Sequence, residues 1–310
     1  MDGALIASIV AATLVAGTPL IIAALGELVA ERAGVLNLGV EGMMSVGALA
    51  AFVTYQGSSN APLAVAAGLA AGVAMSLLFA LLTLSLLANQ VASGLALAIF
   101  GVGLSAFAGK PYESAAMPMP PSLRLPGLAD IPLAGPALFN QPWPVYGSWL
   151  LVGAVAWFLY RSRAGLALRA VGESPGSAHS IGYPVIAIRY AAVAFGGAMA
   201  GVAGAFLSVY YTPLWSQGMV AGRGWIALAL VVFATWRPIR VVLGAYLFGG
   251  VMISQLFLQG LGVHLDIPAQ WLSALPYAAT IVVLVLISRD AASLRLHSPV
   301  SLGQSYRPDS

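Results

Sequence analysis

Residues 24–48, ALGELVAERAGVLNLGVEGMMSVGA, place charged side chains between two apolar runs. Glu27, Glu31 and Glu41 are three of only ten acidic residues in a chain of 310. Asn37 lies between the second and the third of them. The apolar runs on either side determine the class of fold, and the fold must then accommodate the polar residues between them.

Composition indicates an integral membrane protein. Hydrophobic residues make up 60% of the chain and charged residues 7%, whereas soluble domains are about a quarter charged. Apolar stretches of 18 or more residues recur, and each is long enough as a helix to cross roughly 30 Å of hydrocarbon. Alternating ten-residue strands are absent, which favours helices over a barrel. We expect an all-α, polytopic transmembrane helical bundle that forms one domain over residues 1–310.

Nine apolar segments predict about nine or ten membrane segments, the tenth arising from a split or re-entrant piece. The nine segments are residues 4–25, 35–56, 62–88, 91–109, 146–160, 190–211, 220–236, 239–258 and 271–288. Two long connections separate them. Residues 110–145 contain nine of the 19 prolines and predict a loop instead of a helix. Residues 161–189 contain four of the 13 basic residues.

The basic residues predict the orientation, because Lys and Arg near span ends concentrate on the cytoplasmic side. If the 161–189 loop is cytoplasmic, alternation of nine spans puts ten of the 13 basic residues inside. Lys110, Arg124 and Arg223 remain outside. We therefore expect a cytoplasmic 161–189 loop and 289–310 tail, and an extracytoplasmic 110–145 loop.

The order of segments also predicts an inverted repeat. Four segments precede the 146–160 segment and four follow it, so the two sets run in opposite directions. Such repeats are typical of transporters, whose substrate path lies at the repeat interface near mid-membrane. The corresponding interruptions are GVLNLGVEG at residues 34–42 and SQGMVAGRGW at residues 216–225.

The acidic stretch divides into two expected parts. Residues 24–36, as a helix, carry Glu27 and Glu31 on one face and suit a helix at the cytoplasmic interface, with Glu31 and Arg32 in water. Glu41 is different, because an ionised side chain facing lipid costs about 3 kcal/mol. A broken or re-entrant helix near residues 35–45 would let Asn37 and Glu41 line a hydrophilic path. The alternative is that Glu41 only ties spans together.

Two more pairs of residues are candidates for the substrate path. Asn89 and Gln90 join two spans, where they either meet a polar solute or serve as a cap or loop. Trp215 and Gln217 lie near the outer entrance. There an aromatic face either stacks on a base or sugar or serves as an interfacial anchor.

Four glycines form small-xxx-small pairs, Gly68 with Gly72 and Gly197 with Gly201. Such pairs allow two helices to approach closely within a membrane. We expect their role to be structural.

The basic loop contains a short helix with signals at both ends. Ser174 is placed as an N-cap and Pro175 as the first helical residue, while Gly182 and Pro184 end the helix. The helix is therefore expected to last about two turns. Without further information, a solvated linker would fit the same residues.

Three stretches resemble the membrane subunits of ATP-binding-cassette importers in the branched-chain amino acid and ribose permease family, in its nucleoside or simple-sugar branch. They are residues 26–48, 88–110 and 165–205. The resemblance implies that the chain transports a nucleoside by alternating access, with a simple sugar as the second choice. It also implies that residues 173–182 insert into a groove of the ATPase subunit. These residues are Glu173, Ser174, Pro175, Gly176, Ser177, Ala178, His179, Ser180, Ile181 and Gly182.

The implied protein is a transport subunit and not an enzyme. The only lysine, Lys110, lies in GKP, so the chain has no P-loop, and ATP is expected at a partner subunit with no cofactor on this chain. No spacing predicts a metal site or a catalytic pair. The expected partners are the ATPase, a second permease chain or a second copy, and an extracytoplasmic solute-binding lipoprotein, in a bacterial inner membrane. The alternative hypothesis is an ion-coupled secondary transporter with Glu41 as the coupling site.

Overall fold

The structure is a computed structural model that describes residues 3–132, 134–260 and 298–307, together with the single positions 278, 281, 282 and 285. The described chain is mostly helical. The predicted segment 271–288 lies outside the described residues except for those four positions, and so do residues 289–297 of the predicted tail.

The longer helices follow the predicted apolar segments. They are α1 (Gly3–Arg32), α2 (Val40–Ser58), α3 (Ala61–Ala80), α4 (Gln90–Gly109), α6 (Trp143–Arg161), α9 (Val185–Phe206), α10 (Arg223–Phe233) and α11 (Pro238–Gly260). Wider π turns extend two of them, η1 (Leu81–Ser85) after α3 and η3 (Leu207–Tyr211) after α9. The short elements are η2 (Lys110–Tyr112), β1 (Leu123–Arg124), α5 (Ala134–Leu138), β2 (Asn140–Gln141), α7 (Arg163–Glu173) and α8 (Pro175–Ser180).

Five helices in the described residues are long and apolar enough to cross a membrane. They cover Leu5–Arg32, Ala61–Ser85, Gln90–Tyr112, Trp143–Arg161 and Val185–Tyr211. The predicted segments 35–56, 220–236 and 239–258 are not among these five. The helix in segment 220–236, α10, has only 11 residues. At 1.5 Å per residue α10 is about 16 Å long, which is too short to cross as a single helix. The chain is therefore a multi-pass helical membrane protein, and the full span count stays a prediction.

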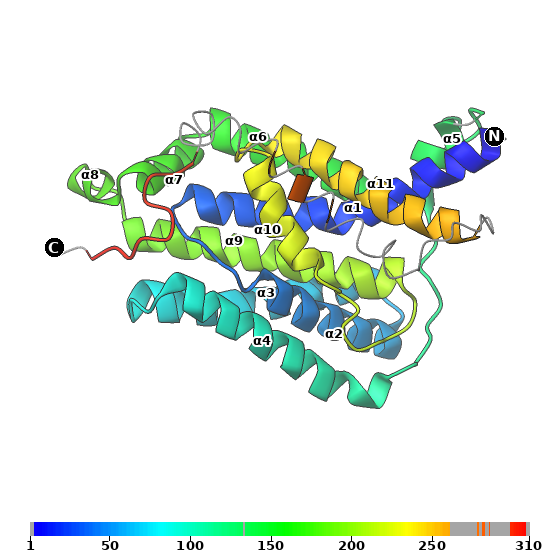
Figure 1. The fold of residues 1–310 in the computed structure, drawn as a ribbon, viewed down its shortest axis with the longest axis horizontal. Coiled ribbons are helices and arrows are strands. Elements are labelled where there is room, and N and C mark those ends of the chain that lie inside the picture. The colour runs from blue at the N-terminus through cyan, green and yellow to red at the C-terminus, as the bar shows by residue number, and fades with distance from the viewer. Residues whose placement is uncertain are drawn as a thin grey trace.

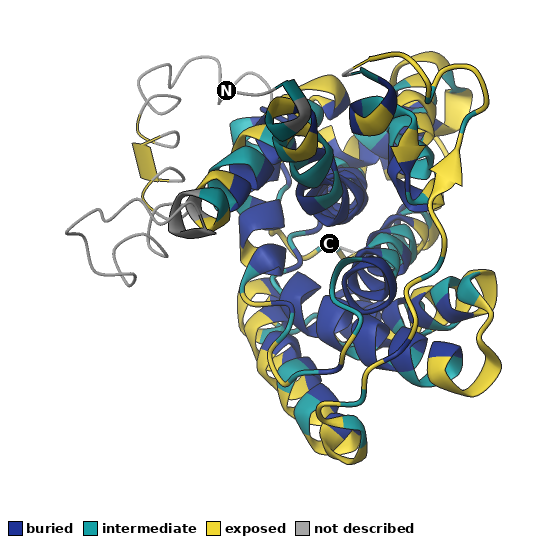
Figure 2. Ribbon diagram, turned by 90° about the vertical axis from the view of Figure 1, so that its right-hand side faces the viewer, coloured by how far each residue is buried: buried dark blue, intermediate teal, exposed yellow. Residues whose placement is uncertain are grey.

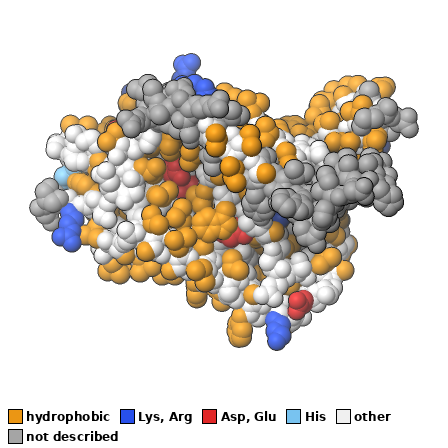
Figure 3. Space-filling view, in the orientation of Figure 1, with side chains coloured by type: hydrophobic (Ala, Val, Ile, Leu, Met, Phe, Trp, Pro, Cys, Tyr) orange, Lys and Arg blue, Asp and Glu red, His pale blue; other side chains and the backbone are white. Residues whose placement is uncertain are grey.

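Helix α9 occupies the centre of the bundle (Figure 1). It packs against α1 on one side and against α2 and α3 on the other, while α4 lies beyond α2. Helices α10 and α11 pack on the outer side of α1. Figure 2, viewed along the long axis, shows buried residues concentrated in the middle of this arrangement. The face in Figure 3 carries many hydrophobic side chains, with a few acidic atoms visible among them.

The two ends of the bundle differ in what they carry. Helix α8 and residues 298–307 lie at one end, called here the α8 end. Helix α5 and the N-terminus lie at the other, called the α5 end. The proline-rich connection at the α5 end is a loop as predicted, but it also contains the five-residue helix α5 and the two-stranded antiparallel pair of β1 and β2. Helix α6 begins at Trp143, three residues before the predicted segment.

The expectation of a wet interfacial helix over residues 24–36 is wrong. Residues 24–32 continue α1 as one helix, and Glu27 and Glu31 are 1% and 2% exposed. The periodicity placed both carboxylates on one face correctly, but that face packs inside the protein. Specific partners hold both carboxylates there, as described below.

The glycine pairs form a seam where α3 and α9 touch through their backbones. A Cβ added to Gly72 would lie 2.1 Å from the carbonyl oxygen of Gly197, and one added to Gly201 would lie 2.1 Å from that of Gly68. Real Cβ atoms do not approach backbone oxygens so closely, so the helices could not pack at this distance with larger residues. The predicted structural role of these glycines is confirmed.

We expect Gly72→Ala to lower the thermal unfolding midpoint in detergent, because the added methyl group forces α3 away from α9 at a cost of about 1–3 kcal/mol. Gly153→Ala in α6 is the matched control, since a Cβ there meets nothing within 4 Å. That control should be neutral or slightly stabilising by helix propensity. Equal midpoints for the two variants would contradict the seam.

Candidate functional site

A broken helix lies between α1 and α2. Gly34 has φ +84°, its amide donates to the carbonyl of Glu31 at 2.8 Å, and the amide of Val35 donates to that of Ala30 at 3.2 Å. These two bonds are those of a Schellman motif, which ends a helix at a left-handed glycine. The predicted break near residues 35–45 therefore occurs at residues 33–39, and the residues after it re-form a helix at Val40.

Buried polar side chains hold this break in place. The amide of Asn37 donates to Oε1 of Glu27 at 3.0 Å, and its own Oδ1 accepts from the Gly39 amide at 2.9 Å. Glu31 accepts a hydrogen bond from the indole nitrogen of Trp236 at 2.5 Å. The end of α1 thus positions both the break and the connection between α10 and α11. These bonds compensate in part for burying the carboxylates, because Oε2 of Glu27 has no hydrogen-bond partner among the described residues.

Glu41 lies in the first turn of α2, and its carboxylate binds the start of α10. The Gly222 amide nitrogen is 2.8 Å from Oε1, and the Gly224 amide nitrogen is 2.7 Å from Oε2. The first amides of a helix have no intrahelical acceptor and carry the positive end of the helix dipole. A buried carboxylate satisfies them, so Glu41 of α2 caps α10.

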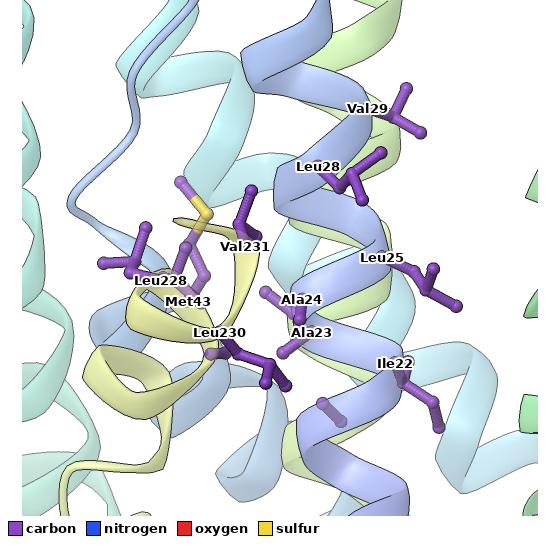
Figure 4. Packing of buried hydrophobic residues seen from close by; sticks show 14 of the residues in the cluster. Ile22, Ala23, Ala24, Leu25, Leu28, Val29, Met43, Leu228, Leu230 and Val231 are labelled. Carbon is purple, nitrogen blue, oxygen red and sulfur yellow. The ribbon is translucent and has the colours of Figure 1, made fainter. Parts of the chain in front are cut away.

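The two helix starts are in direct contact. A Cβ on Gly224 would lie 2.6 Å from the backbone nitrogen and Cα of Glu41. On the other side of α2, a Cβ on Gly42 would lie 2.8 Å from the Cα of Ala98, which is near the middle of α4. Figure 4 shows the next turns of α10, with Leu230 and Val231 near Ala23 and Ala24 of α1. The start of α2, where it meets α10, therefore lies level with the middle of α4.

The two interruptions predicted from the repeat thus come together in the fold. The segment GVLNLGVEG supplies Glu41, and the segment SQGMVAGRGW supplies the amides that Glu41 binds. Arg223, which lies between those amides, directs its guanidinium to the carbonyl of Met219 at 3.0 Å and over the ring of Tyr211. The contact matches the interpretation in which Glu41 ties spans together. Its part in lining a path stays a prediction.

Asn89 and Gln90 lie at the α8 end, away from this contact. Asn89 is the N-cap of α4, with Oδ1 accepting from the Ala92 amide at 2.9 Å. Gln90 is buried, and its Oε1 accepts from the Leu36 amide at 2.8 Å. The capping alternative for Asn89 is therefore present in the structure, and Gln90 supports the residues of the break.

Trp215 and Gln217 line a cavity of about 290 Å³ at the α5 end, together with Lys110 and Glu113. The Trp215 ring is buried against Phe52, with ring centroids 5.8 Å apart. Gln217 is exposed. This cavity offers charged and amide groups to a polar solute. A larger cavity of about 440 Å³ between α1, α6, α7 and α9 has only apolar lining residues.

The predicted helix in the basic loop is confirmed as α8. The Ser174 hydroxyl accepts from the Ser177 amide at 3.3 Å, Pro175 is the first helical residue, and Gly182 has φ +92°. His179 is exposed. The sequence did not predict that α7 would form a second helix before it. That helix packs closely, since a Cβ on Gly172 would lie 2.1 Å from the carbonyl oxygen of Arg32.

The candidate path residues therefore occupy three places instead of one. Asn37 and Glu41 lie at the helix break, Asn89 and Gln90 at the α8 end, and Trp215 and Gln217 at the α5 end. Sequence reasoning missed Arg189, which was counted only for topology and is buried at 1% exposure. An arginine at the start of an apolar segment was the only signal for it.

We expect Glu41→Ala to destabilise the protein by about 2–5 kcal/mol, because the Gly222 and Gly224 amides at the start of α10 lose their acceptor. Glu41→Gln retains one acceptor oxygen and should fall between Glu41→Ala and the parent. Asp130→Asn is the control, since Asp130 forms a surface ion pair with Arg124 that contributes about 1 kcal/mol at most. Thermal unfolding in detergent measures all three, and an unchanged midpoint for Glu41→Ala would refute the capping.

Comparison with known proteins identifies the family of this chain. A family model described as branched-chain amino acid transport system / permease component matches residues 9–284. The chain is 44% identical to the putative glucose ABC transporter permease protein TsgC13 of Haloferax volcanii, over 97% of each chain. It is 35% identical to the guanosine ABC transporter permease protein NupQ of Bacillus subtilis, over 89% of this chain and 90% of that protein.

A third relative is the nucleoside ABC transporter permease protein NupC of Lactococcus lactis, which is 33% identical over 90% of this chain and 91% of that protein. Permeases of this kind work with a partner ATPase and a binding protein, and they lie in the cell membrane. The chain belongs to this permease family and is a membrane subunit of an ABC importer, the transport component and not the ATPase.

Proposed function

We propose that this permease carries a solute built on a sugar ring, either a nucleoside or a simple sugar. The support is the naming of its relatives, one for glucose and two for guanosine or nucleosides. The polar and aromatic groups of the α5-end cavity suit such a solute, because hydroxyls need hydrogen-bond partners and a ring needs a flat surface. No covalent step on the solute is involved.

The meeting of α2 and α10 is the observation that carries the transport mechanism. Two helices that begin inside a membrane protein bring polar groups to membrane depth, here the Glu41 carboxylate and the amides that it binds, and a polar solute would pass beside them. Asn37, Glu41, Trp215 and Gln217 are the proposed path residues, with Asn89 and Gln90 toward the α8 end. Alternating access would then open the path to one side at a time. Family membership favours ATP as the energy source over the ion-coupled alternative.

Residues 173–182 are the proposed contact with the ATPase. Helix α8 projects from the end of the molecule (Figure 1), and only Ala178 of its six residues is buried. The cap at Ser174 and the turn at Gly182 make it a short rigid element, which can pass on a displacement. The α8 end with its 161–189 loop and tail would accordingly be cytoplasmic, and the 110–145 loop extracytoplasmic.

The remaining partners follow from the same role. A second permease chain or a second copy would complete the membrane unit, and a lipoprotein receptor would deliver solute at the α5 end. The membrane is proposed to be a bacterial inner membrane. The relatives come from an archaeon and from bacteria, which supports a cell membrane in either case.

Uptake measurements identify the solute. Cells that express the chain with its ATPase and receptor should accumulate radiolabelled guanosine or glucose. When unlabelled guanosine and glucose compete with the labelled solute, the stronger competitor is the favoured solute. Leucine is the control, because the family description names branched-chain amino acids. Uptake of leucine without uptake of either guanosine or glucose would reject the proposal.

Replacing residues 173–182 by a Gly-Ser linker should prevent the ATPase from co-purifying with the permease and abolish uptake. The matched control is a Gly-Ser replacement of the ten mostly exposed residues 121–130 at the opposite end, which should leave co-purification intact. Normal co-purification and uptake after the first replacement would show that the ATPase docks elsewhere.

A further inference from the structure

Arg189 is a buried cation with three partners. It lies in the first turns of α9 and is 1% exposed. Its Nε donates to the carbonyl of Ala33, its Nη1 to the carbonyl of Gln304, and its Nη2 to the hydroxyl of Ser301, each at 3.1 Å. The planar guanidinium has five N–H donors in fixed directions, which suits three acceptors that lie on different sides of it. A buried cation is expensive unless it is bonded in this way.

The acceptors belong to two segments far apart in sequence. Ala33 is the first residue of the break, and Ser301 and Gln304 belong to the C-terminal segment 298–307. That segment also binds the break directly, since the Gly303 amide donates to the Gly34 carbonyl at 3.2 Å. Gly34 has no room for a side chain, because a Cβ there would lie 2.4 Å from the Ser301 hydroxyl oxygen.

The same segment holds the loop that carries α8. The amide and the hydroxyl of Ser301 both donate to the carbonyl of Gly172, at 3.0 and 2.7 Å. Tyr306 packs on the small cluster of Val171, Ala178 and Val185, with its ring 6.2 Å from that of His179. Residues 298–307 therefore contact both α7 and α8.

A third element joins at Gln90. Its Oε1 accepts from the Leu36 amide, and its Nε2 donates to the Gln304 carbonyl at 3.4 Å. The start of α4 is thus tied both to the break and to the C-terminal segment. Both hydrogen bonds of Gln90 are to backbone groups of these segments.

We propose that residues 298–307, seated on Arg189, act as a strut that transmits displacement of α8 to the helix break at residues 33–39. The inference rests on the proposed docking of the ATPase at α8. Arg189 is a positioning residue in this scheme, because it touches neither solute nor ATP. The break leads directly to Asn37 and Glu41, so a movement delivered there reaches the contact between α2 and α10.

Two variants remove the strut to different extents. Arg189→Gln removes the charged fork, and Ser301→Ala removes only the hydroxyl that joins Arg189 to Gly172, which keeps the test valid if the first variant folds poorly. Arg189→Lys keeps the charge and loses the fork. Arg240→Gln is the control, because Arg240 is an exposed arginine whose hydrogen bond goes to the nearby Thr235.

The first measurement uses the permease alone. Backbone hydrogen–deuterium exchange over residues 33–39 should be about tenfold faster in Arg189→Gln. It should be faster to a smaller extent in Ser301→Ala. Both variants lose hydrogen bonds that hold these residues in place. Arg240→Gln should exchange like the parent. Unchanged exchange in the first two variants would overturn the strut, whether or not the ATPase docks at α8.

The second measurement uses the assembled transporter. Arg189→Gln and Arg189→Lys should still co-purify with the ATPase and hydrolyse ATP, but guanosine or glucose transported per ATP should fall by about tenfold. ATP hydrolysis and thermal stability falling together, with an unchanged amount of solute transported per ATP, would show a merely structural role and overturn the proposal. Failure of the parent to bind its ATPase through residues 173–182 would instead refute the docking, and with it the transmission.

Discussion

The hydrogen bonds from the start of α10 to the carboxylate of Glu41 are the constraint on which the arrangement of interrupted helices depends. A helix that begins inside an apolar bundle exposes amides that neither lipid nor water satisfies there. Glu41 supplies two acceptor oxygens at the required place. Because Glu41 belongs to the first turn of α2, the start of one helix fixes the start of the other. The surrounding glycines then allow the backbones of α2, α4 and α10 to approach closely.

The α8 end follows the same logic with the opposite charge. The cation of Arg189 is surrounded by carbonyl and hydroxyl oxygens, among them the carbonyl of Ala33 just after α1. A guanidinium near carbonyls left free at a helix end complements the negative end of the helix dipole. The carboxylate of Glu41 joins the two helix starts, and the guanidinium of Arg189 joins the segments that meet at the α8 end. Both are held mainly by backbone groups of the protein.

The sequence predicted features that depend on local chemistry. Apolar length gave the helical membrane fold, the Ser174 and Gly182 signals gave α8, and the glycine pairs gave the seam between α3 and α9. It failed where the outcome depended on distant partners. The periodicity of residues 24–36 does not reveal that Trp236 lies within 2.5 Å of Glu31, so it predicts a wet face where the structure has a buried one. The partners of Arg189 lie more than 100 residues away, and no local pattern identifies them.

The seam between α3 and α9 also bears on how this protein can diverge. At Gly72 and Gly201 the neighbouring atoms are carbonyl oxygens of the facing helix, and not side chains that could adopt another rotamer. A compensating substitution across the contact is therefore unavailable, because no residue is smaller than glycine. The surfaces that face lipid can exchange one apolar residue for another with little effect. Substitution of Gly72 or Gly201, in contrast, requires a larger distance between α3 and α9. These positions of the seam are restricted although they carry no side chain.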